Sequence, residues 1–305
     1  LSALHLSTNL KCQNTCKVAA NDYPLDLADN SVDDMYEGCE DKMSEKVEKE
    51  FLENEKNTNE IFRAAWNEAE KQKMIAASYL NKPELLAIFA YTQTTKEIPP
   101  VLNKAVREQG PEYKTTFKYH SLHFFLTSAI KKNVAKKEKN DPGKCYTAYR
   151  RTNVYFTQDV SNKEMRFGHF ASSSLHSLES SRSKKMANVF GEKSCFVIET
   201  CFGADISMYS KFGAGEAEIL IPPYEVFKVT NSGVTGWREL NSRLSCSIPG
   251  KLLGAFFYHF QFTITYRPGS RNIKPDALSQ EYSPPNAPPP LSCRPPASLV
   301  ILHGT

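Results

Sequence analysis

The feature that most constrains the fold is a change of sequence texture near residue 145. Before it, apolar side chains recur at three- and four-residue steps, as Phe62, Ala65, Trp66 and Ala69 do, which predicts helices. After it, short runs rich in Tyr, Phe, Val and Ile alternate with Gly, Ser and Asn, which predicts strands. Helices first and strands later predict an α+β domain.

The expected elements follow from these patterns and from the turn residues between them. The expected helices cover 44–80, 101–109, 122–134 and a short stretch near 175–189, whereas 85–92 fits either a strand or a buried helix. The expected strands are Tyr146–Tyr149, Arg166–Ala171, Cys195–Cys201, Glu218–Ile221 and Phe227–Thr230. The prolines that crowd 280–298 predict a disordered tail, because proline at that density prevents a packed element.

Composition narrows the class of protein. A net charge of +4 over 305 residues is too small to argue for nucleic acid. No stretch has the length of a transmembrane helix, the opening LSALHLSTNL is too polar for a signal peptide, and the apolar run at 299–302 is too short for an anchor-addition signal. The eight cysteines show no paired zinc-binding knuckles. They fit either disulfides or free thiols.

Three sites hold residues that could carry chemistry. Glu216 and Glu218 lie two apart, so on a strand both carboxylates point the same way, and such a pair suits a reaction with cationic character. Arg150 ends a strand-like run, and Ser172 lies at an expected strand-to-helix junction. Each alone fits a plainer role: exposed strand glutamates, a surface ion pair or a helix cap.

Taken together, these residues resemble a known family. In chain order, Arg150, Ser172 and the pair Glu216 and Glu218 resemble the R-S-E-x-E signature of arginine-specific mono-ADP-ribosyltransferases of the vertebrate ecto-enzyme type. The flanking blocks agree: CYTAYR at 145–150, GHFASSSL at 168–175, TCFGADI at 200–206 and EAEILIPPYEVF at 216–227. Upstream blocks, among them NKAVRE at 103–108, extend the resemblance over 24–255. It implies N-terminal helices packed on a mixed or antiparallel β core.

The resemblance also implies a role for each residue, with NAD as co-substrate and no metal. Arg150 would hold the NAD phosphates, and Ser172 would fix the nicotinamide ribose and the catalytic glutamate. Glu218 would stabilise the positive charge that develops as nicotinamide leaves. Glu216 would align an arginine of the acceptor protein and help to remove its proton, which matters because a free guanidinium has a pKa above about 12. Tyr91 is expected to line the NAD pocket.

The same resemblance implies partners for four of the cysteines. The family's disulfides map to Cys145–Cys201 and Cys39–Cys246, which implies a secreted or cell-surface protein. The cysteines at 12, 16, 195 and 293 receive no partner from it.

Two alternatives to a transferase stay open. An NAD glycohydrolase, in which water replaces arginine, needs the same Arg150, Ser172 and Glu218, although Glu216 favours the transferase. A catalytically impaired NAD-binding protein is the other alternative. It is suggested by Arg151, because the family has glycine there, and a long cationic side chain could crowd the pocket or add a phosphate contact.

A second resemblance concerns the end of the chain. The segment FQFTITYRPGSRNIKPDALS at 260–279 resembles the end of the ribonuclease H region of a gypsy-type retrotransposon polyprotein, without that region's metal-binding carboxylates. The expected organisation is therefore a poorly structured segment over 1–23, an ADP-ribosyltransferase domain over 24–255, and a retroelement-like segment with a disordered tail over 256–305.

Overall fold

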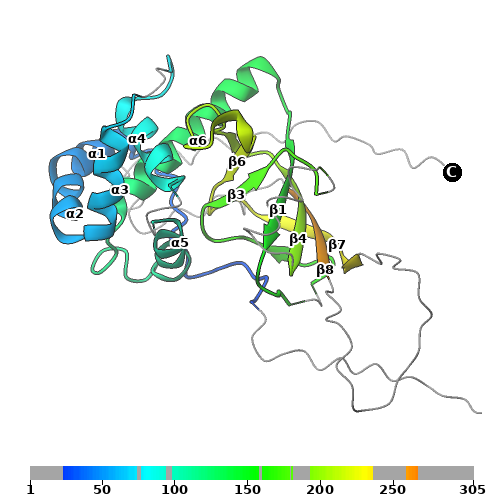
Figure 1. Ribbon diagram of the computed structural model, residues 1–305. Helices are drawn as coiled ribbons and strands as arrows, with labels where there is room; N and C mark the ends of the chain where they lie inside the picture. Colours follow the sequence, from blue (N-terminus) through cyan, green and yellow to red (C-terminus); the bar gives the residue numbers. More distant parts are fainter. Residues whose placement is uncertain are drawn as a thin grey trace, which may run out of the picture.

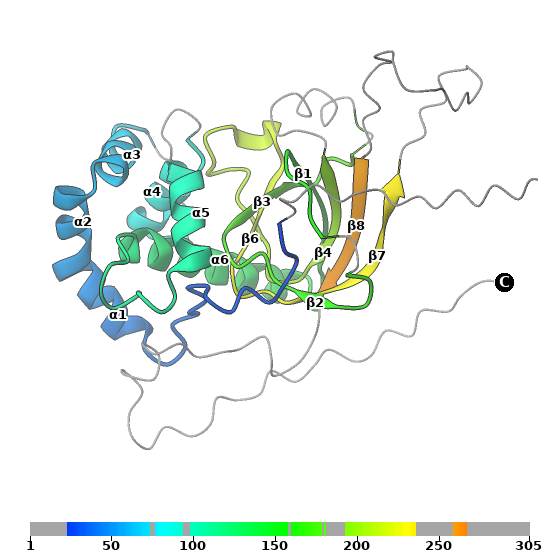
Figure 2. The same cartoon turned by 90° about the horizontal axis from the view of Figure 1, so that it is seen from below.

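The described part of the protein consists of a helical part and one β-sheet, packed side by side (Figures 1 and 2). The computed structural model describes residues 23–73, 77–93, 98–157, 160–178, 180, 193–235 and 259–266. In both views helices α1–α5 gather on one side, and α6 extends from them to the sheet. This arrangement confirms the α+β class expected from the sequence.

The helical part is more finely divided than the sequence suggested. It contains α1 (Glu40–Lys46), a π-helical turn (Val47–Phe51), α2 (Leu52–Thr58), α3 (Glu60–Glu70), α4 (Lys82–Tyr91), α5 (Ile98–Glu108) and α6 (His120–Asn140). A continuous helix over 44–80 is wrong, because Asn59 takes an extended conformation, with φ of −120° and ψ of 99°. Its side chain instead accepts a hydrogen bond from the backbone N–H of Phe62 and so begins α3.

The ambiguous stretch 85–92 belongs to a helix. Asn81 and Glu84 form a capping box at the start of α4, and Pro83 occupies its first turn, where the missing N–H costs nothing. The expected helices over 101–109 and 122–134 are confirmed as α5 and α6. In the part of the chain that the structure describes, no helix combines the length and apolarity that crossing a membrane requires.

One mixed sheet holds all the strands found among the described residues. They are β1 (Tyr146–Thr152), β2 (Glu164–Met165), β3 (Ala171–Ser174), β4 (Ser194–Thr200), β5 (Ala204–Asp205), β6 (Glu218–Ile221), β7 (Phe227–Thr235) and β8 (His259–Tyr266). Their spatial order is β2-β7-β8-β4-β1-β3-β6-β5. The pairs are antiparallel except β4 with β8, which is parallel.

One expectation near the middle of the chain is wrong, and a second is contradicted at residues 175–178 and 180, the described part of its range. No strand runs over Arg166–Ala171, because Gly168 has a φ of +64° and its backbone follows the N-terminal segment: Ser31 Oγ donates to the Gly168 carbonyl at 2.7 Å. The described residues of the expected helix near 175–189 are not helical, and Leu175 N–H donates to the Ala217 carbonyl instead. Residues 181–189 lie outside the described part.

The two faces of the sheet bury different cores. The alternation of β6 shows this directly: Leu220 packs into the core shared with the helices, whereas Ile219 and Ile221 pack into a second core on the opposite face. The second core includes Phe196 of β4 and Ile264 of β8, both fully buried. The sheet therefore lies between two apolar layers, and its central strands are held from both sides.

Strand β8 lies inside the sheet, although it comes from the retroelement-like segment. It pairs in parallel with β4 from Ser194↔Phe260 to Glu199↔Thr265, and antiparallel with β7 from Phe227↔Tyr266 to Thr235↔His259. Because β2 and β7 reach the other strands only through β8, the sheet would split without it. The folded sheet thus continues to Tyr266, past the residue 255 at which the sequence suggested that the transferase domain ends.

Truncation of the chain tests this placement. A chain that ends at Ala255 should lose its cooperative thermal transition, because removal of β8 exposes the edges of β4 and β7. A chain that ends at Gln280 keeps β8 and should melt at the temperature of the full chain. Ile264→Ala in the full chain should lower the free energy of unfolding by about 2–5 kcal/mol. Equal thermal melts for the two truncated chains would contradict the role of β8.

Candidate active site

The three signature positions meet on neighbouring strands. Arg150 lies on β1, Ser172 on β3 and Glu218 at the first residue of β6, and these strands are adjacent in the order β1-β3-β6. The antiparallel pair β3–β6 places Ser174 opposite Glu218, so Ser172 lies two residues further along the same face. Residues that span 68 positions of sequence, from 150 to 218, are therefore brought together on three adjacent strands toward the β5 edge of the sheet.

Arg150 is held across the gap between β1 and β3. Its Nη1 atom donates a hydrogen bond to the Ser172 carbonyl. Burial lowers the pKa of the Arg150 guanidinium, and the nearby Tyr91 and Glu218 act in the opposite direction. A guanidinium stays charged through such a shift, so the site contains a fixed, partly buried cation.

Glu218 is the most perturbed acid of this group. Its side chain is only 5% exposed, and its Oε2 atom has no hydrogen-bond partner. Burial raises the pKa of Glu218 to about 7, with a smaller increase from Glu216, whereas a hydrogen bond with Ser172 and the charge of Arg150 lower it. A buried carboxylate with one unpaired oxygen beside a cation is what a ligand-binding carboxylate requires.

Glu216 reaches the site by a route that differs from the expected strand alternation. It follows a 3₁₀ turn (Gly213–Gly215) in a helical conformation, and Ala217 then takes a φ of +45° before β6 begins. Ser174 Oγ donates to the Glu216 carbonyl at 2.6 Å and holds this turn against β3. Glu216 is partly buried, which raises its pKa, and it raises the pKa of Glu218 in turn.

Tyr91 lies beneath the site. It is 2% exposed, and its hydroxyl donates to the Phe170 carbonyl at 2.8 Å and accepts from Asn103 Nδ2 at 3.1 Å. A hydrogen bond with Ser172 also acts on its pKa, which burial raises. These contacts indicate that Tyr91 supports β3 from the helical side.

Two further groups near the site were not singled out as site residues from the sequence. The Nδ1 atom of His169 and the Oδ1 atom of Asn103 are buried without a hydrogen-bond partner. His169 lies three residues before Ser172, and burial together with the charges of Arg150 and Arg107 lowers the pKa of its imidazole to about 3. The GHFASSSL block contains His169, but no spacing rule sets it apart.

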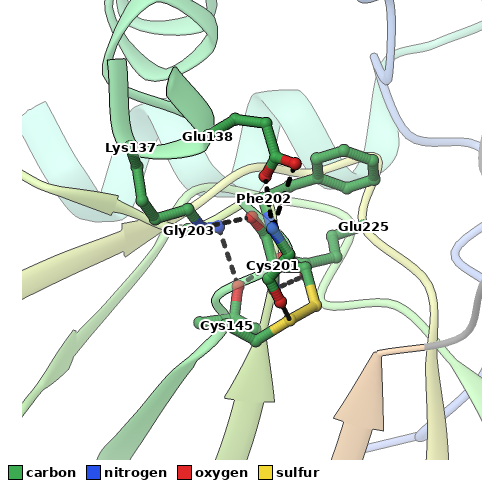
Figure 3. The surroundings of a disulfide bond; sticks show 9 residues. Lys137, Glu138, Cys145, Cys201, Phe202, Gly203 and Glu225 are labelled. Atoms are coloured by element: carbon green, nitrogen blue, oxygen red, sulfur yellow. Dashed lines mark hydrogen bonds between the residues drawn. A yellow bond between two sulfur atoms is a disulfide. The ribbon is translucent and has the colours of Figure 1, made fainter. Parts of the chain in front are cut away.

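A disulfide at Cys145, five residues before Arg150, fixes the start of β1. Cys145 and Cys201 are bonded, as the family resemblance implied (Figure 3). Beside them the buried Glu225 accepts hydrogen bonds from the Cys201 N–H at 2.8 Å and from Thr200 Oγ1 at 2.5 Å. Lys137 of α6 donates to the Cys201 carbonyl at 2.6 Å. The other expected disulfide is not described, because Cys246 lies outside the described residues; Cys39 is buried.

The Arg151 guanidinium donates hydrogen bonds to groups outside the signature residues. It pairs with Cys195 across β1 and β4, whereas Arg150 pairs with Phe196, so the two arginines project from opposite faces of β1. The Arg151 guanidinium donates to the Leu178 carbonyl at 2.5 Å and to the Cys195 sulfur at 3.5 Å. The crowding that this residue suggested from the sequence is therefore not seen.

Comparison with known proteins identifies the family. The model of the family "ART: NAD:arginine ADP-ribosyltransferase" matches residues 25–241. The chain belongs to this family of NAD:arginine ADP-ribosyltransferases, as the R-S-E-x-E signature indicated. Among the described residues, no group of three or more His, Cys, Asp and Glu side chains is placed to hold a metal ion.

Characterised relatives give the scale of the similarity. The chain is 33% identical to NAD(P)(+)--arginine ADP-ribosyltransferase 1 of Gallus gallus over 68% of its own length, and this match spans 64% of that relative, less than two thirds. It is 30% identical to the erythroblast NAD(P)(+)--arginine ADP-ribosyltransferase of Gallus gallus, over 77% of each chain. It is 35% identical to T-cell ecto-ADP-ribosyltransferase 1 of Mus musculus, over 72% of this chain and 73% of that one.

Solved structures of the family have the same fold. The crystal structure of the eukaryotic mono-ADP-ribosyltransferase ART2.2 superimposes with a TM-score of 0.58 at 28% identity, covering 81% of this chain and 97% of that one. A variant of that protein in complex with NAD superimposes with a TM-score of 0.57 at 27% identity, over 81% and 97% of the two chains. The expected fold of the ADP-ribosyltransferase type is therefore confirmed.

The burial of Glu218 predicts a dependence of stability on pH. Its pKa is higher in the folded state than the ordinary 4.5, so the folded chain binds the proton more tightly and loses stability as pH rises from about 4.5 to about 7. Glu218→Gln removes this penalty. The variant should be more stable than the wild type at pH 8, by at most about 3 kcal/mol, and the difference should shrink toward pH 5. Urea unfolding at both pH values measures it, and a variant that is less stable than the wild type at pH 8 would contradict it.

The position of Arg151 predicts a second outcome. Arg151→Ala loses charge-assisted hydrogen bonds away from the site, so the free energy of unfolding should fall by about 1–3 kcal/mol. The Michaelis constant for NAD should stay within about twofold of the wild type, because the Arg151 guanidinium is bonded to the Leu178 carbonyl and the Cys195 sulfur and not to a signature residue. Arg150→Ala is the matched control and should raise that constant about tenfold or more. A tenfold rise for Arg151→Ala would place Arg151 in the site.

Proposed function

We propose that this protein transfers ADP-ribose from NAD to arginine side chains of acceptor proteins and releases nicotinamide. The observation that carries the proposal is the buried Glu218 carboxylate, whose Oε2 atom has no partner and which lies close to Arg150, Ser172 and Glu216. Family membership and the activities in the names of the relatives support it.

The residues present suit a dinucleotide. The guanidinium of Arg150 offers several N–H donors in a planar fork, and its contact with the Ser172 carbonyl uses only part of them. It would hold the diphosphate of NAD. Ser172 would orient the nicotinamide ribose and Glu218, with which its hydroxyl interacts, and Tyr91 would hold β3 in place from below. NAD supplies the ADP-ribosyl group and the leaving nicotinamide.

Glu218 acts as the catalytic carboxylate. Positive charge develops on the ribose as the bond to nicotinamide breaks, and a fixed negative charge in a poorly solvated site stabilises it strongly. Only the ionised form supplies that charge. With a pKa of about 7, Glu218 is partly protonated at neutral pH, and the nearby Arg150 favours the ionised form.

Glu216 acts on the acceptor. An arginine guanidinium is charged and a poor nucleophile until it loses a proton, and a neighbouring carboxylate both attracts the cation and takes that proton. Glu216 is more exposed than Glu218, and burial raises its pKa, which improves it as a base. This second carboxylate favours a transferase over a glycohydrolase, which needs no site for a cationic acceptor.

The protein acts outside the cell or at its surface. The Cys145–Cys201 disulfide requires an oxidising compartment to persist, and several relatives bear names of ecto-enzymes. The domain that acts there runs from residue 24 to 266, so that the retroelement-like segment contributes β8 as structure and no nuclease chemistry.

Two glutamine variants test the division of labour. Glu218→Gln keeps the shape but removes the charge, and should lower both transfer to agmatine and NAD hydrolysis by about 10²–10³-fold. Glu216→Gln should suppress transfer to agmatine by a similar factor and leave NAD hydrolysis within a fewfold. Nicotinamide release with and without agmatine measures both.

Glu199→Gln, an exposed glutamate of β4, is the control and should change neither activity. A wild-type protein that hydrolyses NAD at the same rate with or without agmatine and forms no adduct would establish the glycohydrolase instead. Equal loss of both activities in Glu216→Gln would refute the separate role of that residue.

A further inference from the structure

The backbone before β3 is clamped in a way that fixes the position of His169. Arg107 Nη1 donates to the Phe167 carbonyl at 2.6 Å, and Ser31 Oγ donates to the Gly168 carbonyl at 2.7 Å. Gly168 has a φ of +64°, and a Cβ atom there would lie 2.3 Å from that of Ala28, so no other residue fits. Two side chains from distant segments, Arg107 and Ser31, thus hold the carbonyls of Phe167 and Gly168. The next residue along the chain is His169.

The carbonyls that follow belong to the site itself. Phe170 accepts from the Tyr91 hydroxyl, and Ser172 accepts from Arg150. His169 is therefore the one residue between the clamp and these contacts whose side chain has an unused polar atom, namely Nδ1. Its ring also stacks on Phe167, with centroids 6.1 Å apart and planes inclined by 22°. Buried polar atoms are normally hydrogen-bonded, so the Nδ1 atom of His169 indicates a partner from outside the described protein residues.

The charges around the ring define that partner. Arg150 and Arg107 both lie close enough to oppose protonation of His169, so the imidazole is neutral and can carry hydrogen on Nδ1 without charge. Arg107 is already paired with Asp26 at 2.8 Å, so Arg150 is the cation that favours an anion near this ring, and a phosphate oxygen is an acceptor that a guanidinium binds well. The part of NAD with this chemistry is the diphosphate.

We propose that His169 is an NAD-binding residue, whose Nδ1–H donates a hydrogen bond to a diphosphate oxygen beside Arg150. The inference rests on the proposed function, because it takes NAD as the ligand of this site. It adds a neutral donor to the residues of the signature, and it gives the clamp over Phe167 and Gly168 a role in binding.

Two substitutions separate this role from packing. His169→Phe keeps an aromatic ring on Phe167 but has no polar atom, whereas His169→Gln keeps a donor and gives up the ring. Isothermal calorimetry with ADP-ribose measures binding without turnover. His169→Phe should weaken ADP-ribose binding about ten- to hundredfold, the loss expected for a hydrogen bond to a charged oxygen, and His169→Gln should stay within about threefold of the wild type.

Steady-state kinetics supply the second readout. In His169→Phe the Michaelis constant for NAD should rise by the same factor, while that for agmatine and the thermal melting temperature stay unchanged. Wild-type affinity for ADP-ribose in His169→Phe would overturn the proposal, and so would an equal loss in both variants. A wild-type chain that binds ADP-ribose in a His169-dependent manner but transfers nothing would refute the proposed transferase and leave this inference standing.

Discussion

The site depends on the burial of one carboxylate next to one cation. Glu218 and Arg150 are buried on β6 and β1, where removing charge from water is costly and mutual attraction recovers only part of that cost. The raised pKa of Glu218 shows that the cost exceeds the recovery. A protein gains nothing in stability from such a group, so its presence at the junction of β1, β3 and β6 is explained by what it binds.

The rest of the fold fixes the positions of Glu218 and Arg150. Arg150 is fixed through β1, which is anchored at its start by the Cys145–Cys201 disulfide and along its length by β4. Strand β4 is in turn held by β8, and β8 by β7. Because every one of these strands is interior, a change at β8 propagates to Arg150 through two strand pairs, although the two lie more than 100 residues apart in sequence.

The sequence predicted the site residues that a short stretch of neighbouring residues is enough to recognise. The R-S-E-x-E signature located Arg150, Ser172 and Glu218 because each lies in or at the start of a short strand, in a block of recognisable composition, and the structure brings these strands together. The sequence misplaced a strand over 166–171, because an apolar run there satisfies its backbone through Ser31 and Arg107 and not through a neighbouring strand. It placed the end of the transferase domain at residue 255, although residues 260–266 alternate apolar and polar side chains as a strand does. Their alternation of apolar and polar residues fits an interior strand as well as an edge, and only the pairing partners decide.

The local sequence pattern also leaves open which groups a side chain contacts. Arg151 differs from the family's glycine and, from the sequence, was a reason to doubt activity. Adjacent residues of a strand project from opposite faces, so a long side chain next to Arg150 is harmless if the far face has acceptors for it. The Leu178 carbonyl and the Cys195 sulfur are such acceptors. A glycine is needed at this position only where ligand or backbone occupies the space into which the side chain projects, and here the guanidinium has its own partners. The arginine that replaces the family's glycine therefore links β1 to Leu178. Leu178 follows β3, and β3 carries Ser172.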